Sequence, residues 1–390
     1  MYDVIVIGAG PTGCYAAREL ARRSYEVLVL EEHAEIGEPV HCTGILGLEA
    51  CARFDLDPAS FETYLSSARF VSPHGQTFRV AADEAKAVVV DRSRFDQLLG
   101  DQALSAGASF LLGTRVERVV TGDDAAVVSA NSLGERTSYC ASLVVVATGA
   151  DDRITEQLGL ASPSAPPIFG AQLITQPQGL EEVEVHVGRR IAPGGFAWAV
   201  PANGHGCRVG LISRRQPQPL LRRFVRSLEQ RGVIRCNGAE MQCRAVPCGP
   251  RLPSFGERVL VVGDAAGQVK STTSGGIYYG LLGTEVAVAT AEAVLREGDF
   301  SASALSAYEA GWLDRLGREQ RTGRILRSIR NALTDSEIEA FFWLARRTNI
   351  PQLLSQLHFD WHTSGLLSLL WNEWSAALSP ADGKRPAVRR

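Results

Sequence analysis

The chain of 390 residues is 45% hydrophobic and 21% charged, a composition typical of a globular protein with two or three cores, which excludes a disordered or fibrous chain. Its 40 basic and 43 acidic side chains leave a net charge of -3, so the overall positive field with which proteins hold nucleic acid is missing. We therefore expect no nucleic-acid partner.

The N-terminus lacks a basic segment followed by a cleavable apolar stretch, and no run reaches the roughly 18 consecutive apolar residues that a membrane-spanning helix needs. Even the most lipophilic helical stretch, 281–295, contains Glu285 and Glu292. Eight cysteines without a CxxC pair predict neither a disulfide scaffold nor a zinc ribbon, and no metal site is expected. We expect a cytoplasmic protein, with any membrane contact peripheral and on the inner face of the cytoplasmic membrane.

The first 31 residues predict a βαβ unit. Residues 2–7 are a short, β-branched, fully apolar run, and residues 14–23 change to helical spacing with alanines and charges. Residues 26–31 form a second apolar run. Two strands without polar alternation are typical of a parallel pair that is buried on both faces.

A GxGxxG motif lies between the first strand and the helix of this unit, which is the context that such a match requires. Gly8 would make the tight turn, Gly10 would let a pyrophosphate approach the backbone, and Gly13 would pack the helix against the strand. The helix N-terminus then favours the phosphates. Glu31, at the end of the second strand, is expected to bond the ribose hydroxyls, so the sequence predicts a dinucleotide site.

Two later apolar runs, 143–148 and 258–263, are expected to return to the same sheet, which implies that another domain is inserted between them. Residues 163–219 alternate polar with apolar residues and are rich in proline and glycine, as antiparallel strands with one wet face are. Segment 62–90 is expected to join that sheet. The predicted class is α/β, a discontinuous Rossmann-type domain (1–61, 91–160 and 254–301) with an inserted antiparallel β-sheet substrate domain (62–90 and 161–253) and a helical C-terminal region (302–390).

The strand at 258–263 ends in a Gly–Asp pair that resembles a segment of the flavoprotein hydroxylases typified by p-hydroxybenzoate hydroxylase. The resemblance implies that Asp264 binds the ribityl chain of FAD and that bare backbone at Gly275, Gly276 and Ile277 lies close to the flavin ring. The alternative is a surface loop with a capping Asp. A second GxGxxG is missing from the sequence, so we expect an external reductant, NAD(P)H or ferredoxin, that docks transiently.

Four motifs together resemble the geranylgeranyl reductase family of FAD enzymes: VHCTGIL at 40–46, VDRSRFD at 90–96, PGGFAWAVP at 193–201 and GDAAGQVKSTTSGGIYYG at 263–280. The resemblance runs from residue 1 to about 300. It implies hydrogenation of C=C bonds in a geranylgeranyl or other prenyl chain on a lipid, quinone or pigment, by hydride from N5 of reduced FAD. By position in the motifs, the implied FAD contacts are Thr12, Glu31, Cys42, Thr43, Arg92, Val116, Asp264, Gly276 and Ile277.

The family's pocket pattern PxxYxWxFP departs here, because Phe196 replaces the tyrosine and a phenolic proton donor is lost. The proton donors considered instead are Cys42, Tyr278, Tyr279 and a flavin-bound water. Ser271 and Ser274 replace the Pro and Gly of related sequences, which predicts a different loop shape beside the flavin. The expected pocket walls are Phe169, Phe196, Trp198 and Val200, together with Ile277 and Tyr279, with ordinary core packing as the alternative.

Several alternatives stay open at this point. A monooxygenase or halogenase has the same fold, and a non-catalytic flavin-binding redox module is a third possibility. Arg92 either steadies the flavin or forms a surface ion pair. The arginine-rich stretch 315–330 is interpreted as a solvated helix face or a dock for an acidic carrier such as ferredoxin. The apolar segment 365–374 either lies in the membrane interface or packs on the protein itself.

Overall fold

The computed structural model describes residues 1–164, 166, 168–202, 206–236 and 238–366. Its first layer is a sheet in the order β20-β21-β11-β1-β2-β8, in which β1, β2, β8, β11 and β21 are parallel neighbours. Val4, Ile5 and Val6 of β1 are fully buried, which explains the unbroken apolar run and confirms the predicted βαβ unit. The strands are β1 (Tyr2–Ile7), β2 (Val27–Leu30), β8 (Ser109–Leu111), β11 (Glu135–Val146), β20 (Phe255–Gly256) and β21 (Val259–Val261).

Helices cover this sheet, and two antiparallel strands extend it. α1 (Pro11–Ala21) follows β1 directly, with a proline in its first turn, and packs against α3 and α6. α3 (Arg92–Ser105) begins where the Asp91 carboxylate accepts a hydrogen bond from the backbone N–H of Arg94. The other elements of this domain are β9 (Thr114–Thr121), β10 (Ala126–Ser132), α4 (Arg153–Gln157), the 3₁₀ turn η2 (Gly263–Ala266) and α6 (Ile277–Glu297).

The inserted domain is a second, mainly antiparallel sheet in the order β17-β13-β16-β15-β14-β5-β6, with β18 paired to β13. The amphipathic helix α5 (Pro217–Gln230) covers its outer face, where Leu221, Phe224 and Leu228 are buried. The strands are β5 (Ser67–Val71), β6 (Thr77–Ala81), β13 (Ile168–Pro177), β14 (Val183–His186), β15 (Phe196–Ala202), β16 (Gly206–Ser213), β17 (Ile234–Arg235) and β18 (Gln242–Val246).

The segment predicted to join this sheet, 62–90, divides between two sheets. Strands β5 and β6 join the antiparallel sheet, as expected. However, β4 (Phe61–Leu65) and β7 (Ala87–Val90) pair with β3 (Ile45–Gly47) in a small separate sheet, because β7 is fully buried and bonded on both edges. A short pair, β12 (Ser162–Pro163) with β19 (Arg251–Leu252), ties together the two points where the chain enters and leaves the inserted domain.

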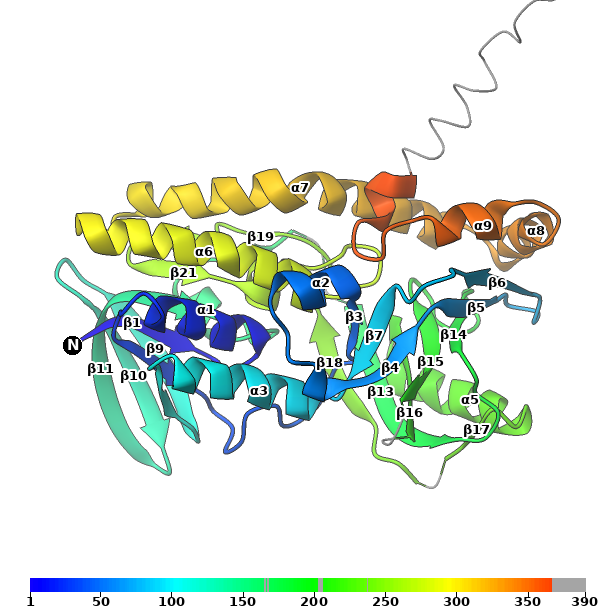
Figure 1. Cartoon of the computed structure of the whole chain (residues 1–390), viewed down its shortest axis with the longest axis horizontal. Coiled ribbons are helices and arrows are strands. Elements are labelled where there is room, and N and C mark those ends of the chain that lie inside the picture. The colour runs from blue at the N-terminus through cyan, green and yellow to red at the C-terminus, as the bar shows by residue number, and fades with distance from the viewer. Residues whose placement is uncertain (165, 167, 203–205, 237, 367–390) are drawn as a thin grey trace, which may run out of the picture.

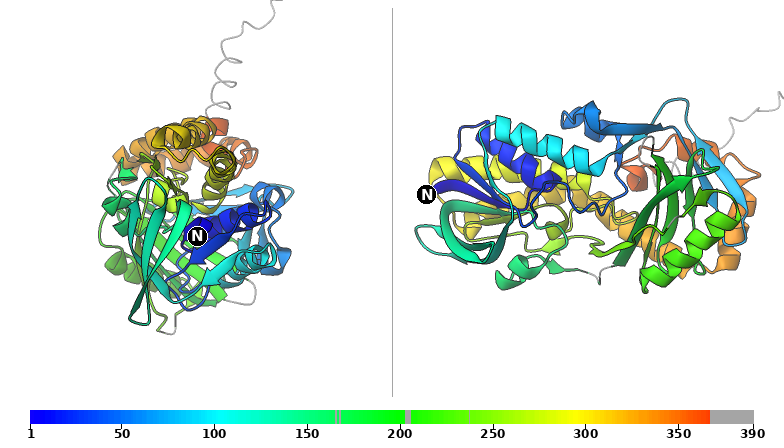
Figure 2. Two further views of the ribbon diagram at one scale, coloured as in Figure 1. Left: turned by 90° about the vertical axis from the view of Figure 1, so that its left-hand side faces the viewer. Right: turned by 90° about the horizontal axis from the view of Figure 1, so that it is seen from below.

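The described part of the C-terminal region, residues 302–366, is mainly helical, as predicted. α7 (Ala302–Ala332) lies beside α6 and continues toward the inserted sheet, where α8 (Asp335–Ala345) and α9 (Ile350–Ser355) lie near β5 and β6 (Figures 1 and 2). A capping box between Thr334 and Glu337 starts α8. In the described part of the chain no helix is long and apolar enough to cross a membrane. The remaining short helices are α2 (Leu48–Arg53) and η1 (Pro58–Ser60).

Candidate functional site

A cavity of about 1050 Å3 lies between the parallel sheet and the antiparallel sheet and is lined by both. Ligand pockets commonly measure roughly 300 to 1000 Å3, so this cavity has room for more than one small group. One end is formed by the turn after β1, the end of β2 and the start of β9. The other end is walled by strands β14 and β15 and by the segment around α9.

The GxGxxG turn forms the first end, and its glycines have different roles. A Cβ on Gly8 would lie 2.6 Å from the carbonyl oxygen of Ala147, and one on Gly13 would lie 1.9 Å from the carbonyl oxygen of Gly8. Both positions therefore need glycine for packing. A Cβ on Gly10 would meet nothing within 4 Å, because this residue faces the open cavity. That arrangement fits a pyrophosphate approaching the backbone at the start of α1.

Glu31 is fixed at the end of β2 and is 9% exposed. Its Oε2 accepts a hydrogen bond of 2.7 Å from the backbone N–H of Ala9. Its Oε1 accepts hydrogen bonds from the backbone N–H of His33, at 3.0 Å, and from Nδ1 of the same residue, at 2.6 Å. The carboxylate thus lines the cavity beside the GxGxxG turn, as do Thr12 and Val116.

Asp264 lies in η2, directly after β21, and lines the cavity. Within the described residues its carboxylate has no hydrogen-bond donor, and burial raises its pKa against the opposing effect of Arg244 and Arg92. A Cβ on Gly276 would lie 2.1 Å from Oδ1 of Asp264, so the start of α6 approaches this carboxylate as closely as glycine permits. A free acceptor beside bare backbone is what the ribityl chain and ring of FAD require, so these residues fit that cofactor.

Cys42 and Thr43 lie in a loop that lines the middle of the cavity. The backbone N–H of Gly44 donates to the Cys42 sulfur at 3.4 Å, and the guanidinium of Arg92 also contacts that sulfur. Arg92 forms an ion pair of 2.7 Å with Asp96, and its side chain is 12% exposed. Burial opposes the charge of Arg92, but Asp96 and Cys42 raise its pKa. Arg92 is therefore a largely buried cation at the cavity wall rather than a surface one.

Two polar side chains that the sequence analysis missed hold this loop in place. Gln172 of β13 accepts a hydrogen bond of 2.6 Å from the Thr43 hydroxyl and donates one of 3.3 Å to the Cys42 carbonyl. Arg208 of β16 donates to the carbonyl oxygens of Thr43, at 2.5 Å, and Val90, at 2.7 Å. It also forms a buried ion pair of 2.7 Å with Glu62. Arg208 is the one charged residue in the apolar run CRVGLI, and that position could have indicated its role in the sequence.

The second end of the cavity is apolar. Phe196, Trp198 and Val200 alternate along β15 onto the same face and line the cavity there. Phe169, which was predicted as a fourth wall, does not line the cavity and is 42% exposed. Successive residues of a strand point to opposite faces, and it is the next residue, Gly170, that lines the cavity.

Tyr278 and Tyr279 were predicted as proton donors, and Tyr279 also as a wall, but neither lines the cavity. Ile277 does line it, and the two tyrosines that follow point elsewhere because each helical residue turns by about 100°. The Tyr278 hydroxyl donates to Glu49 at 2.6 Å, and the Tyr279 hydroxyl donates to the carbonyl of Asp360 at 3.1 Å. Burial raises the pKa of both phenols. Both hydroxyls therefore contact other parts of the protein rather than the cavity.

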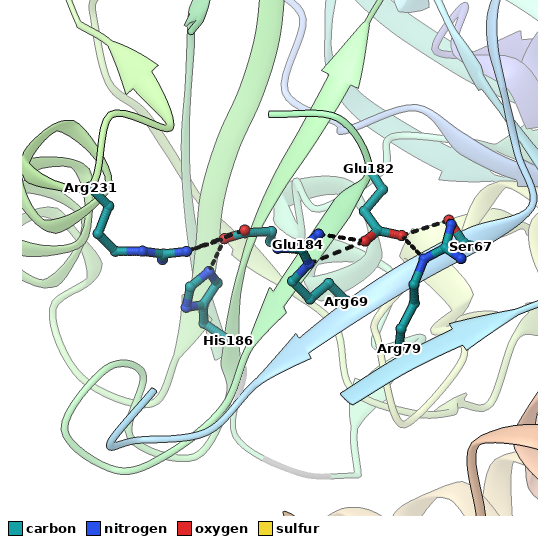
Figure 3. Close-up of polar contacts among 7 residues, drawn as sticks. All are labelled: Ser67, Arg69, Arg79, Glu182, Glu184, His186 and Arg231. Carbon is teal, nitrogen blue, oxygen red and sulfur yellow. Dashed lines mark hydrogen bonds and ion pairs between the residues drawn. The ribbon is translucent and has the colours of Figure 1, made fainter. Parts of the chain in front are cut away.

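β14 has two different faces. Val183 and Val185 line the cavity, whereas Glu184 and His186 point to the opposite side and are 5% and 3% exposed. There the Glu184 carboxylate accepts hydrogen bonds from Nε2 of His186, at 2.8 Å, and from Arg231, at 3.2 Å (Figure 3). Burial lowers the pKa of His186, although Glu184 opposes that effect.

A second polar cluster joins the residue that precedes β14 to strands β5 and β6. The Glu182 carboxylate accepts hydrogen bonds from the Ser67 hydroxyl, at 2.7 Å, and from Nε of Arg69, at 3.1 Å, both in β5 (Figure 3). It also accepts one of 2.7 Å from Nε of Arg79 in β6 (Figure 3). The cluster fixes the parallel pairing of β14 with β5, and so the position of the cavity wall.

The C-terminal segment closes the cavity near the loop 270–274. Lys270 lines the cavity and forms a buried ion pair with Asp360, whose side chain is 1% exposed. Nε2 of His362 lies 2.7 Å from the Thr272 hydroxyl, and Nδ1 lies 3.1 Å from the Phe359 carbonyl. Burial and Lys270 lower the pKa of His362, so its neutral ring donates from Nδ1 and accepts at Nε2. Among the residues that the structure describes, no group of side chains is arranged to hold a metal ion.

Comparisons with known proteins identify the family of the chain. Residues 2–229 match the family described as pyridine nucleotide-disulphide oxidoreductase. The digeranylgeranylglycerophospholipid reductase 2 of Methanopyrus kandleri is 31% identical over 375 residues, which cover 90% of this chain and 92% of that protein. The digeranylgeranylglycerophospholipid reductase of Methanocaldococcus jannaschii is 28% identical and covers 87% of this chain and 89% of its own length.

Solved structures share the fold. A geranylgeranyl bacteriochlorophyll reductase-like protein from Thermoplasma acidophilum has a TM-score of 0.84 at 21% identity and covers 97% of each chain. A flavin-dependent brominase has a TM-score of 0.68 at 16% identity and covers 96% of this chain and 99% of its own. Fold and site together define an FAD-dependent oxidoreductase. The chain belongs to the geranylgeranyl reductase family, which confirms the resemblance that the four sequence motifs indicated.

Proposed function

We propose that this protein hydrogenates C=C bonds in the isoprenoid chains of a glycerophospholipid, with a prenyl quinone or a pigment as alternative carriers of such a chain. The observation that carries the proposal is the cavity, which joins a dinucleotide end to a chamber walled by valines and aromatics. A long hydrocarbon chain buries its apolar surface in such a chamber. The names of the relatives from Methanopyrus kandleri and Methanocaldococcus jannaschii point to the same substrate class.

FAD, when bound and reduced, supplies the hydride for such a reduction. The second carbon needs a proton, and Cys42 is the proposed donor because its thiol lines the cavity beside the Arg92 guanidinium. A neighbouring cation stabilises the thiolate that remains after donation. Gln172 and Arg208 position the loop that carries the thiol. The walls at Phe196, Trp198 and Val200 exclude water from the alkene.

We infer that the electrons come from an external reductant, NAD(P)H or a ferredoxin, since the sequence contains a single GxGxxG site. We also infer peripheral contact with the inner face of the cytoplasmic membrane, where a lipid substrate would be found. α8 supports that contact with the exposed side chains of Phe341, Trp343 and Leu344. The other predicted contact segment, 365–374, lies outside the described residues beyond residue 366.

Anaerobic single turnover tests the proposal. The dithionite-reduced protein is mixed with a digeranylgeranyl lipid, geranylgeranyl diphosphate or menaquinone, and flavin absorbance and product mass are read together. A gain of two mass units for each oxidised flavin, without oxygen, is the expected result. Because the reaction consumes one electron pair and two protons for each double bond, the ratio of product to flavin is fixed at one.

Two other outcomes separate the alternatives. Flavin oxidation that waits for oxygen, and passes through a new absorbance band, would assign the protein to the monooxygenases or halogenases that share its fold. Bound flavin that no prenyl compound oxidises would instead indicate a non-catalytic redox module.

A further inference from the structure

A cluster of arginines without acidic partners lies where α7 meets the cavity. Arg327 is 6% exposed, and Arg330 lines the cavity, although the stretch 315–330 had been interpreted as a solvated face. Among the described residues, no carboxylate lies within ion-pair distance of Arg214, Arg327 or Arg330. Most other buried cations among the described residues have such a partner, for example Arg208 with Glu62. Arg258 also has none, but its guanidinium donates to three backbone carbonyl oxygens. Charges removed from water are normally paired, so the buried Arg327 and the half-buried Arg330 need an explanation, whereas Arg214 is exposed.

The contacts of Arg330 are few and long. Its guanidinium donates to the carbonyl oxygens of Thr272, at 3.3 Å, and Gly194, at 3.4 Å, and its Nε is buried without a partner in the described part of the chain. The guanidinium carbon lies 5.8 Å from the ring centroid of Phe196. Burial, followed by the charges of Arg327 and Arg214, lowers the pKa of Arg330 to about 10. The neighbouring arginines therefore repel the Arg330 charge, and two long hydrogen bonds stabilise it only weakly.

Further unpaired polar atoms lie on the adjoining loop. The hydroxyl oxygens of Ser271 and Ser274 are buried and have no hydrogen-bond partner among the described residues. Ser274 lines the cavity, and Arg327 donates to the carbonyl of Ser271 at 3.3 Å. Hydroxyls and a guanidinium are all donors that can bind one anion.

We propose that Arg330 binds the phosphate of the lipid substrate, with Arg327 and Arg214 supplying the surrounding positive charge. The apolar wall at Phe196, directly beneath the guanidinium, then receives the first part of the hydrocarbon chain. The inference rests on the proposed function and deepens it, because it makes an anionic headgroup a determinant of specificity. A planar guanidinium suits phosphate because it can donate two parallel hydrogen bonds.

Binding to the FAD-loaded full-length protein tests this inference. The probes are digeranylgeranylglyceryl phosphate, digeranylgeranylglycerol and inorganic phosphate, with the lipids in a neutral detergent and affinity measured by tryptophan fluorescence. The variant is Arg330→Gln, and the matched control is Arg318→Gln, an exposed arginine on the same helix. The phosphorylated lipid should bind wild type at least tenfold more tightly than the neutral lipid. Arg330→Gln should abolish that difference, while Arg318→Gln should retain it.

Melting of the ligand-free protein separates binding from a structural role. Removing an uncompensated, half-buried charge should leave the melting temperature of Arg330→Gln unchanged or raised, whereas loss of a structural contact would lower it. Equal weakening of both lipids, or an unchanged preference for the phosphorylated one, would overturn the inference. Inorganic phosphate binding wild type as tightly as the phosphorylated lipid would assign the site to a free anion and overturn the headgroup role.

Failure here is distinct from failure of the proposed function. If the wild-type protein reduces the neutral lipid and shows no preference for the phosphorylated one, the proposed function stands and only the phosphate site is rejected. If it prefers the phosphorylated lipid but reduces no alkene, the phosphate site stands and the proposed function is rejected.

Discussion

Gly10 and Gly13 lie three residues apart in one turn, yet only Gly10 faces open space. Its φ of -73° is one that alanine adopts freely, so Gly10→Ala should fold with a change in stability under about 1 kcal/mol. The added methyl group would occupy the approach of the pyrophosphate, so FAD content should fall at least tenfold. Flavin absorbance per protein and a thermal melt measure the two effects.

Gly13→Ala is the matched contrast, because its Cβ would lie 1.9 Å from the carbonyl oxygen of Gly8. This variant should lose folded structure together with the cofactor. Full FAD content in Gly10→Ala would contradict the assignment of this turn to the pyrophosphate.

Cys42 is the proposed proton donor, and its replacement by alanine should slow alkene reduction by about 100-fold or more, as loss of a general acid does. FAD content should change by less than about twofold, because other groups line most of the cofactor end. Cys243, which also lines the cavity but is exposed, provides the control variant Cys243→Ala, with turnover near that of wild type. Equal turnover in the two variants would remove Cys42 from the mechanism. Single-turnover kinetics with the preferred prenyl lipid provide the measurement.

At the scale of elements, the two faces of strand β14 have different roles. Its valines form part of the cavity wall, while Glu184 and His186 form a buried polar pair on the reverse side with Arg231. The alternation of the strand separates ligand contact from structural support. Substitutions at adjacent positions of β14 should therefore have different consequences, the valines for lipid affinity and the polar pair for stability.

The polar pair makes stability depend on pH. Burial lowers the pKa of His186 below its ordinary value of 6.5, so below that pH the unfolded chain binds the extra proton more readily than the folded protein does. The free energy of unfolding should therefore fall as pH decreases from about 7 to 5, by up to roughly 1.4 kcal/mol per pH unit for one such group.

His186→Gln should flatten this slope, as measured by urea unfolding at several pH values, with pH 8 as the common reference. Some slope should remain, since the pKa values of His41 and His362 are lowered as well. A variant slope equal to that of wild type would show that His186 does not titrate between the two states.

At the scale of the whole molecule, the Lys270–Asp360 ion pair ties the C-terminal region to the cavity loop. Asp360→Asn should destabilise the protein by about 3 to 5 kcal/mol, because it leaves the Lys270 charge buried without its partner. The double variant Lys270→Met, Asp360→Leu should recover much of that loss, since apolar residues need no charge partner. Urea unfolding measures both.

Arg136→Gln, which removes an exposed ion pair with Glu117, is the control and should cost about 1 kcal/mol or less. A loss of similar size in Asp360→Asn would mean that the C-terminal region docks mainly through other contacts.

Local sequence patterns predicted much of the secondary structure of this molecule. They did not predict the contacts between residues that are distant in the sequence. The βαβ unit, the glycine turn and the helical C-terminal region follow from spacing within short windows. The support that Arg208 gives to Thr43 joins positions 165 residues apart, and the Lys270–Asp360 pair joins positions 90 apart. Such contacts depend on how sheets and helices pack against each other, and short windows of a single sequence do not reveal that packing.

α7 is one uninterrupted helix of 31 residues, about 46 Å long, that runs from the core beneath the parallel sheet to the inserted sheet. Domain hinges are made of loop or terminal residues that absorb backbone rotation, and the body of this helix contains neither. A continuous helix that contacts both parts therefore holds the cofactor end and the apolar chamber at a fixed distance from each other. A hinge motion that separated the two sheets would have to bend this helix or detach it from one of them.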